Sequence, residues 1–289
     1  MLNLIYPIRQ SIALSNTMFR LYNRAKRSQQ KQVRFDLSKT KSITPFGIIM
    51  LTSTIAECTL GEKECILRRP QDKKCGDYLN DIGFYEFFAL SHPECAEGIA
   101  TKTVQLKRAS GIDYQLADQI ITVFDNSLNL SPGVKGSLGM SIRETMTNVI
   151  SHSGVQDYYV CAWTYPAQKQ IRLCITDLGI GILKSLKSSS KYKDLTDDYD
   201  AIIKATEEGV SAREETDGYG LTHIKKFLSV NEGRLCIISG KGKVFWKFDQ
   251  GKTLKQYMAK PFRGTIVKLV INIDKEGYYQ LASEVEDLI

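Results

Sequence analysis

A carboxylate and a carboxamide stand four residues apart at Glu144 and Asn148. The apolar residues around them recur at helical spacing, and positions i and i+4 of a helix lie on one face, about 5–6 Å apart at Cβ. Both side chains can therefore face the same ligand. The amide oxygen of Asn148 suits a hard cation such as Mg²⁺, and the carboxylate of Glu144 can orient or deprotonate a nucleophile.

A second motif, Asp177-Leu-Gly179-Ile-Gly181, directly follows a predicted strand over 170–176. Glycines let the backbone approach a ligand closely, and an Asp at a strand end can accept a hydrogen bond from an exocyclic amine. The pattern predicts a binding loop, although the same letters also occur in plain turns.

A third motif, Asp217-Gly218-Tyr-Gly220-Leu221, directly precedes a predicted helix over 221–228. A glycine turn that leads into a helix presents free N–H groups and the positive end of the helix dipole, which favour phosphates. Each motif alone occurs often by chance. Their order, their spacing and the strands and helices around them together indicate one shared site.

In this order the three motifs resemble the N, G1 and G2 boxes of the GHKL superfamily. This is the ATP-binding fold of gyrase B subunits, histidine kinases and anti-sigma-factor serine kinases. The segment 144–152, Glu-Thr-Met-Thr-Asn-Val-Ile-Ser-His, is especially similar to the N box of the anti-sigma-factor kinases. The segment 264–266, Gly-Thr-Ile, resembles the closing strand of the family. The resemblance covers 111–289.

The resemblance implies an α/β sandwich that binds ATP and Mg²⁺, with the long polar stretch 183–217 as an ATP lid. Glu144 would be the catalytic residue, Asn148 would carry Mg²⁺, and Asp177 would read adenine. The residues expected at the nucleotide are Asn148, Asp177, Gly179, Gly181, Arg213, Gly218, Gly220, Leu221 and Thr265.

Alternating short strands and helices over 1–110 predict a separate small domain of the α/β or α+β class. The sequence of this part resembles a STAS-type domain. The resemblance rests on the segments 35–38 and 45–48, followed by Tyr-Leu at 78–79 and Ile-Gly-Phe at 82–84. That is the fold of the anti-sigma-factor antagonists. We therefore expect an N-terminal STAS-like domain, 1–110, followed by a GHKL domain, 111–289.

The STAS resemblance has one departure from the family pattern. Regulated antagonists carry a phosphorylatable Ser or Thr at the turn before a helix, whereas Pro45 and Phe46 stand there in this chain. Thr44 is the nearest hydroxyl. Because Pro offers no acceptor oxygen, we expect this domain to dock a partner or its own ATPase rather than to be phosphorylated at the turn.

Basic residues concentrate near the start of the chain. The net charge of +7 arises from 1–110, where 17 bases face 10 acids, while 111–289 holds 22 of each. The first 34 residues contain seven bases and no acid. This arm fits a mitochondrial presequence, a patch for nucleic acid or anionic lipid, or a solvated surface helix through 18–22. We favour the surface helix, because runs of charge are usually solvated faces.

The composition excludes several classes of protein. Hydrophobic residues make up 43% and charged residues 25%, which is typical of a soluble globular protein and not of a collagen-like, disordered or disulfide-stapled one. Seven Cys without a CxxC pair predict reduced, mostly buried thiols and a cytoplasmic protein. With three His, a His-rich metal site is not expected.

Three uses of ATP fit these motifs. The first is a slow ATPase or ATP-driven switch that controls a protein partner, with Glu144 activating water. The second is a protein serine/threonine kinase of the anti-sigma-factor type, which the N-box likeness favours. The third is a nucleotide sensor without turnover. A histidine kinase is not expected, because no helix pair with a phosphoacceptor His precedes the motifs. The partner stays unidentified, and a homodimer stays open.

Overall fold

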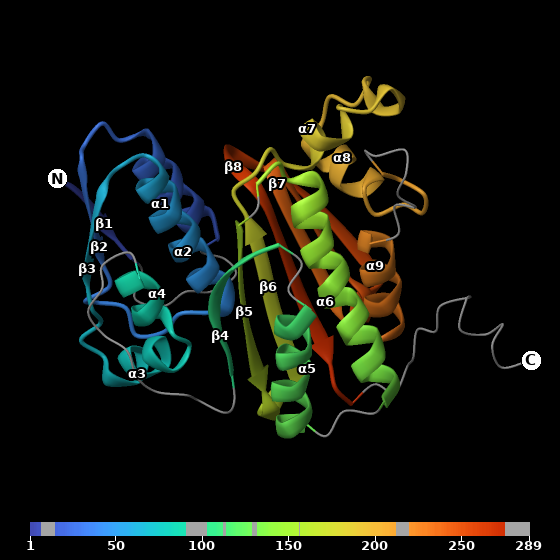
Figure 1. Cartoon of the computed structure of the whole chain (residues 1–289), viewed down its shortest axis with the longest axis horizontal. Helices are drawn as coiled ribbons and strands as arrows, with labels where there is room; N and C mark the ends of the chain where they lie inside the picture. Colours follow the sequence, from blue (N-terminus) through green and yellow to red (C-terminus); the bar gives the residue numbers. More distant parts are fainter. Residues whose placement is uncertain are drawn as a thin grey trace, which may run out of the picture.

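The structure, a computed structural model, describes residues 1–6, 15–90, 103–111, 114–128, 132–155, 157–211 and 220–274. These residues form four layers: a three-stranded sheet, a pair of helices, a five-stranded sheet and a second group of helices (Figure 1). The mixed α/β class expected from the sequence is confirmed. None of the described helices is both long enough and apolar enough to cross a membrane.

The first sheet is parallel, with the strand order β1-β2-β3. Its strands are β1 (Leu2–Ile5), β2 (Gln32–Asp36) and β3 (Glu64–Arg68). Parallel neighbours need a crossover, which α1 (Ser15–Arg27) and α2 (Pro45–Leu60) provide. The short helices α3 (Lys73–Asp81) and α4 (Phe84–Leu90) follow. The order of strands and helices predicted for this part is confirmed.

Helix α2 lies between the two sheets and is apolar on all sides for that reason. Thirteen of its sixteen residues are buried. Its N-terminus is capped by Thr44, whose Oγ1 accepts a hydrogen bond from the Gly47 backbone N–H at 3.2 Å, and Pro45 occupies the first turn, where no N–H is needed. Thr44, the hydroxyl nearest the turn at Pro45 and Phe46, therefore caps the start of the helix.

Helix α1 is the amphipathic surface helix that the sequence predicted. Its apolar side packs into the core between the sheets, where Met18, Phe19 and Tyr22 are at most 4% exposed. Only the basic side of α1 faces solvent. The sequence pattern located the helix but could not show that a second sheet covers it.

The second sheet has the order β4-β5-β6-β8-β7, and all its neighbouring strands are antiparallel. Its strands are β4 (Thr103–Ser110), β5 (Asp157–Tyr165), β6 (Gln170–Asp177), β7 (Arg234–Lys247) and β8 (Lys252–Asn272). Helices α5 (Tyr114–Leu128), α6 (Pro132–His152) and α9 (Gly220–Val230) cover one face (Figure 1). The other face packs against α1 and α2. Two separate apolar cores thus flank one sheet.

The pairing of β4 corrects the expected domain boundary. Residues 103–110 were assigned to the first domain, but they pair with β5 and form the edge of the second sheet. By strand pairing, the boundary lies before Thr103. A single edge strand carries little information about its partner in its own sequence, because the pairing is made with residues about fifty positions away.

Two further expectations for the second part change. The strands expected at 234–239 and 243–248 form one continuous strand, β7, whose pairing is irregular at Gly240 and Gly242. The described part of the polar stretch 183–217 contains two short helices, α7 (Ile182–Leu186) and α8 (Asp198–Lys204). It is therefore a folded segment over 183–211 rather than a long irregular loop.

Helix α8 is held against the β7–β8 hairpin by its first residues. Oδ2 of Asp198 accepts the backbone N–H of Lys241 at 2.8 Å, and Asp197 accepts a hydrogen bond from the Tyr257 hydroxyl. A Cβ at Gly240 would lie 2.3 Å from Asp198 Oδ1, so only glycine permits this approach.

The thiols follow the expectation from the sequence. Six cysteines lie in the described part, and all six are free and buried: Cys58, Cys65, Cys75, Cys161, Cys174 and Cys236. Cys95 lies outside the described residues.

Candidate functional site

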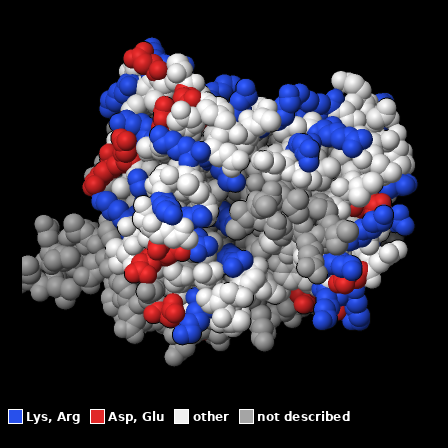
Figure 2. Space-filling model, turned by 180° about the vertical axis from the view of Figure 1, so that it is seen from behind, with Lys and Arg blue, Asp and Glu red and all other residues white. Residues whose placement is uncertain are grey.

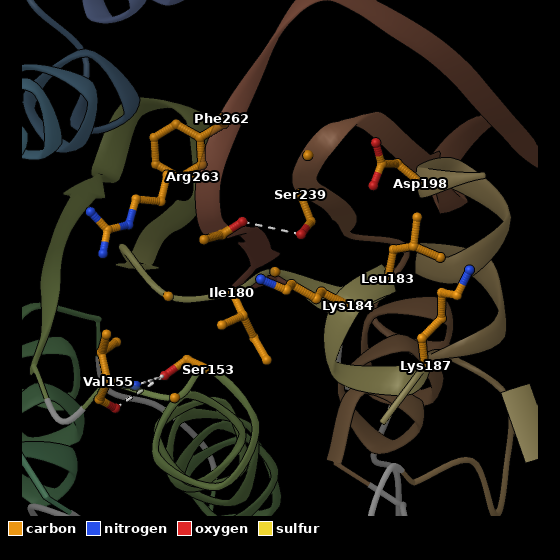
Figure 3. Close-up of a pocket in the computed structure, with 15 residues that line it drawn as sticks. Ser153, Val155, Ile180, Leu183, Lys184, Lys187, Asp198, Ser239, Phe262 and Arg263 are labelled. Atoms are coloured by element: carbon orange, nitrogen blue, oxygen red, sulfur yellow. Dashed lines mark hydrogen bonds between the residues drawn. The ribbon is translucent and has the colours of Figure 1, made fainter. Parts of the chain in front are cut away.

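A cavity of about 550 Å³ opens where the end of α6 meets the loop after β6 and the middle of β8. Its walls come from four separate pieces of chain: 153–155, 179–181, 183–187 and 262–264, with Asp198 and the end of the first half of β7 on the remaining side. In Figure 3 the side chains of Ile180, Lys184 and Ser239 lie around this space. Gly179 and Gly181, the two glycines of the second motif, therefore both line this cavity.

Asp177, the last residue of β6, lies directly beneath the loop that forms the cavity wall. It is 2% exposed, and its Oδ1 accepts the backbone N–H of Gly179 at 2.8 Å. Burial raises the pKa of this carboxyl to about 7, while hydrogen bonds from the backbone N–H groups of Gly179 and Thr265 act in the opposite direction. Asp177 is not itself among the residues that line the cavity; it packs against Gly179 and Gly264, which do line it. A carboxyl with a raised pKa beside a cavity is a candidate functional group.

Asp177 fits into the structure because two neighbouring residues, Gly179 and Gly264, have no side chain. A Cβ on Gly264 would lie 2.2 Å from the Asp177 carbonyl oxygen and 2.7 Å from its Oδ1. A Cβ on Gly179 would lie 2.2 Å from the Ser153 carbonyl oxygen and 2.8 Å from the same Oδ1. Gly264 also has a φ of +85°, which disfavours a side chain in any case. The close packing of β6, α6 and β8 around the carboxylate thus requires both glycines.

The hydroxyl of Ser239 fixes the loop on the other side of the cavity. Its Oγ donates to the Gly264 carbonyl at 3.1 Å (Figure 3). The same Oγ accepts the Ile182 backbone N–H at 2.8 Å. Ser239 is 1% exposed, and a Cβ on Gly181 would approach its Oγ to 2.8 Å. This one side chain joins β7, β8 and the start of α7 at the cavity wall.

Cations line the rim of the cavity. Lys184 lies on α7, Lys187 directly follows it, and Arg263 lies on β8. Asp198 is the one acidic side chain among the lining residues. In Figure 3 the amine of Lys184 lies close to Ile180, whereas Arg263 points away from the centre, toward α1 and α2. The rim therefore offers positive charge to an anionic group above a floor that is buried and glycine-lined.

The first motif lies on α6, as predicted, but that helix ends at His152 and the cavity lining begins at Ser153, so Asn148 is not among the lining residues. Asn148 is partly exposed, and its Nδ2 is buried with no hydrogen-bond partner in the described part of the chain. A buried amide without a partner is what a polar ligand would satisfy. The side chain of Glu144 lies outside the described set.

The third motif is described only in part. Gly220 is the first residue of α9, and Leu221 packs against the core on the helical face of the second sheet. The start of a helix at Gly220 agrees with the expectation. Arg213 and Gly218 lie outside the described residues, so their expected place beside phosphates stays a prediction.

Thr265, expected at the adenine site, acts through its backbone. Its carbonyl accepts the Thr176 hydroxyl at 3.0 Å, and its N–H helps to hold the pKa of Asp177 down. Thr265 thus positions the end of β6 and the carboxylate that follows it.

Several residues of the site were missed by sequence reasoning. Lys184 and Lys187 were left out because only a closed lid was expected to bring them to the site, yet both line the cavity here. Their signal was a pair of lysines three positions apart, just after the glycine loop. Ser153 and Ser239 carried no such signal, since a single Ser at the end of a helix or inside a strand is common.

The cavity wall on β8 is also in contact with the N-terminal part of the chain. Phe262 packs against Phe19 and Tyr22, with ring centroids 6.1 and 5.0 Å apart. Arg263 approaches Glu57 of α2, with Nη1 3.6 Å from Oε1. The same carboxylate, 8% exposed, also meets Lys26 at 3.1 Å and the Tyr22 hydroxyl at 3.1 Å.

This contact affects the ionisation of Tyr22. Burial, followed by the nearby charge of Glu57, raises the pKa of the Tyr22 phenol well above its ordinary value. The phenol therefore stays protonated at physiological pH and can donate to Glu57. Residues 262–264 of β8 are held on one side by this group and form the cavity wall on the other.

No cluster of three or more His, Cys, Asp or Glu side chains that could hold a metal ion is found in the described ranges.

Comparison with known proteins adds no further assignment. No protein-family model matches the chain, and no curated protein is similar to it in sequence.

Proposed function

We propose that the chain is a Mg-ATP-binding regulatory protein of the GHKL type, with a STAS-like domain packed on its ATP-binding domain. It would act as a slow ATPase or ATP-driven switch that controls a protein partner in the cytoplasm. The parallel β1-α1-β2-α2-β3 order supports the first assignment. Helices on one face of a five-stranded sheet, with the first motif on α6 and the second beginning at Asp177, the last residue of β6, support the second.

The observation that carries the proposal is the buried carboxylate of Asp177 beneath the glycine-lined cavity. An apolar and glycine-rich floor accepts a flat base, and a carboxylate there can accept the exocyclic amine of adenine. The Gly179 N–H already binds Oδ1, so the amine would share that oxygen or use Oδ2. Lys184 and Lys187 on the rim would face the phosphates.

The unpartnered Nδ2 of Asn148 is a hydrogen-bond donor, so it would suit a phosphate oxygen rather than a cation. By the family resemblance, the amide oxygen of Asn148 would supply one ligand to Mg²⁺, and the nucleotide phosphates would supply others. Bound Mg²⁺ would neutralise charge that develops on the phosphates. Glu144, four residues earlier on the same helix, would accept a proton from the attacking water or hydroxyl.

A regulatory role is favoured over simple hydrolysis by the contact between the cavity wall and α1 and α2. A ligand that shifts residues 262–264 has to move Phe262 and Arg263 against Tyr22 and Glu57. The nucleotide would then make different contacts with the wall in two arrangements of the N-terminal part. Any ligand-driven switch requires such a difference in contacts between its two states. A kinase that transfers phosphate to a protein, or a sensor without turnover, would use the same site.

The test is calorimetric titration of the full chain with Mg-ATP, followed by phosphate release on the same sample. Binding with release supports the ATPase, and Glu144→Ala should then keep binding but lose release. Binding without release would favour the kinase or the sensor. Absence of binding would contradict the proposal as a whole.

A further inference from the structure

A second hollow lies on the N-terminal part of the chain, apart from the nucleotide cavity. It has a volume of about 380 Å³ and is bordered by α1, the start of β1 and residue 260 of β8. Four of its lining residues are basic: Arg20, Arg24, Arg27 and Lys260. The other three lining residues are uncharged, so no acid of the described part of the chain borders the hollow.

The basic residues come from two places in the sequence that are far apart. Arg20, Arg24 and Arg27 are spaced by four and three positions along α1, which puts them on one face of the helix. Lys260 is more than 230 positions later and reaches this place because α1 packs against β8. All four side chains are exposed. The fold therefore concentrates charge that the sequence spreads over two segments.

None of these four cations has an acidic partner in the described part of the chain. Arg20 donates to the Thr17 hydroxyl at 3.2 Å, which is a neutral group. The nearby Lys26 shows the contrast, because it lies on another face of α1 and pairs with Glu57. In the upper right of Figure 2, Lys and Arg side chains gather with no Asp or Glu among them.

The helix dipole accounts for only part of this charge. Arg24 and Arg27 lie in the last turn of α1, where the negative end of the dipole favours cations. Arg20 is a turn or more earlier, and Lys260 belongs to a strand. Like charges gathered around one hollow repel each other, so the arrangement becomes favourable when an anion enters.

The lining indicates which kind of polyanion fits. No aromatic side chain borders the hollow, so it offers no platform for stacking the bases of a single-stranded nucleic acid. Leu2 is its one apolar lining residue, which is too little to insert into a bilayer. Three arginines present planar forks of donors, which match carboxylate and phosphate oxygens in a bidentate manner.

We infer that the hollow between α1 and β8 is a docking site for an acidic segment of a partner protein, whose carboxylate or phosphate groups pair with Arg20, Arg24, Arg27 and Lys260. This site is separate from the nucleotide cavity and does not depend on ATP binding. It is a mode of recognition in which clustered arginines select acidic or phosphorylated peptides.

The probe is a fluorescein-labelled octaglutamate peptide, followed by fluorescence anisotropy with the full chain. The test variant carries Arg20→Gln, Arg24→Gln, Arg27→Gln and Lys260→Gln. Gln has nearly the helix propensity of Arg, so α1 should remain folded, which circular dichroism checks. We expect a loss of affinity of about tenfold or more at ~20 mM salt, and weaker binding of the unaltered chain at ~150 mM salt.

The matched control removes the same charge elsewhere, through Lys39→Gln, Lys41→Gln, Lys74→Gln and Lys193→Gln, which are all exposed. The control should bind the peptide nearly as well as the unaltered chain. Lys260→Gln alone leaves α1 untouched and should weaken binding about twofold, so the inference remains testable if the quadruple variant fails to fold.

Two other polyanions decide the class of partner. A duplex oligonucleotide and phosphatidylcholine vesicles that contain phosphatidylserine are titrated in parallel. If the chain binds either of these more tightly than octaglutamate, and this binding is lost in the test variant but kept in the control variant, then the occupant is not a protein segment. Equal losses in the test and control variants, or no binding of octaglutamate at all, would overturn the site itself.

Discussion

The floor and the rim of the proposed nucleotide cavity are built in different ways. The floor consists of Gly179 and Gly264 with the buried Asp177 packed behind them, and it is fixed by hydrogen bonds of 2.8 and 3.1 Å. The rim consists of Lys184, Lys187 and neighbours on short helical turns, with side chains that face solvent.

This difference separates two tasks. A buried carboxylate in a fixed frame can select a base, because an unsatisfied partner there is costly. Exposed lysines add attraction for phosphates without fixing one geometry, because a solvated ammonium group contributes little and adapts easily. The following predictions test this division.

The largest effect is expected for Gly264→Ala, which inserts a methyl group against Asp177. The positive φ and the contact at 2.2 Å should together lower the free energy of unfolding by about 3 kcal/mol, measured by urea denaturation. Gly251→Ala is the matched control, because Gly251 has a φ of +59° but nothing within 4 Å of its added Cβ. It should cost about 1 kcal/mol. Equal losses would show that the floor is not tightly packed.

A second prediction concerns the pH dependence of stability. The pKa of Asp177 is raised from 3.8 to about 7 in the folded protein, so the fold binds this proton more tightly than the unfolded chain does. Its contribution to stability is fully present below about pH 4 and is lost as pH rises through 7.

Asp177→Asn removes this titration. Unfolding measured from pH 4 to pH 8 should show a flatter profile for the variant than for the unaltered chain, and nucleotide binding should be lost. An unchanged profile would place the carboxylate in a wetter environment. Unchanged affinity for ATP would move recognition of the base to another residue.

The smallest effect is expected at the rim. Lys184→Ala with Lys187→Ala should weaken ATP about tenfold and leave adenosine unaffected, since adenosine has no phosphates. Lys191→Ala with Lys193→Ala, two exposed lysines later in the same segment, is the control and should change neither affinity. Equal weakening of adenosine and ATP would contradict the division between floor and rim.

Much of the fold could be predicted from local patterns. Helical periodicity located α6 and α9, and runs of apolar residues located the strands β5 and β6. The glycine at 179 was recognised as a point of close approach, and its missing Cβ is indeed what lets Ser153 and Asp177 pack there. These features depend on residues that are near each other in the sequence.

The rest depends on pairs that are distant in the sequence. The edge strand β4 was assigned to the wrong side of the boundary, because its pairing with β5 is made across about fifty residues. Lys184 and Lys187 were left out because only a closed lid was expected to bring them to the site, whereas the packing of α7 against Ser239 already places them at the cavity.

By itself the sequence determined the order of the motifs, the mixed class of the fold and the excess of basic residues near its start. Only the tertiary structure decided that Glu57 meets Arg263 beside the cavity wall and that Lys260 joins the arginines of α1. The physical reason is that local patterns and tertiary packing depend on residues at different separations in the sequence. Backbone geometry fixes which neighbours share a face of one element, whereas packing between elements decides which faces meet.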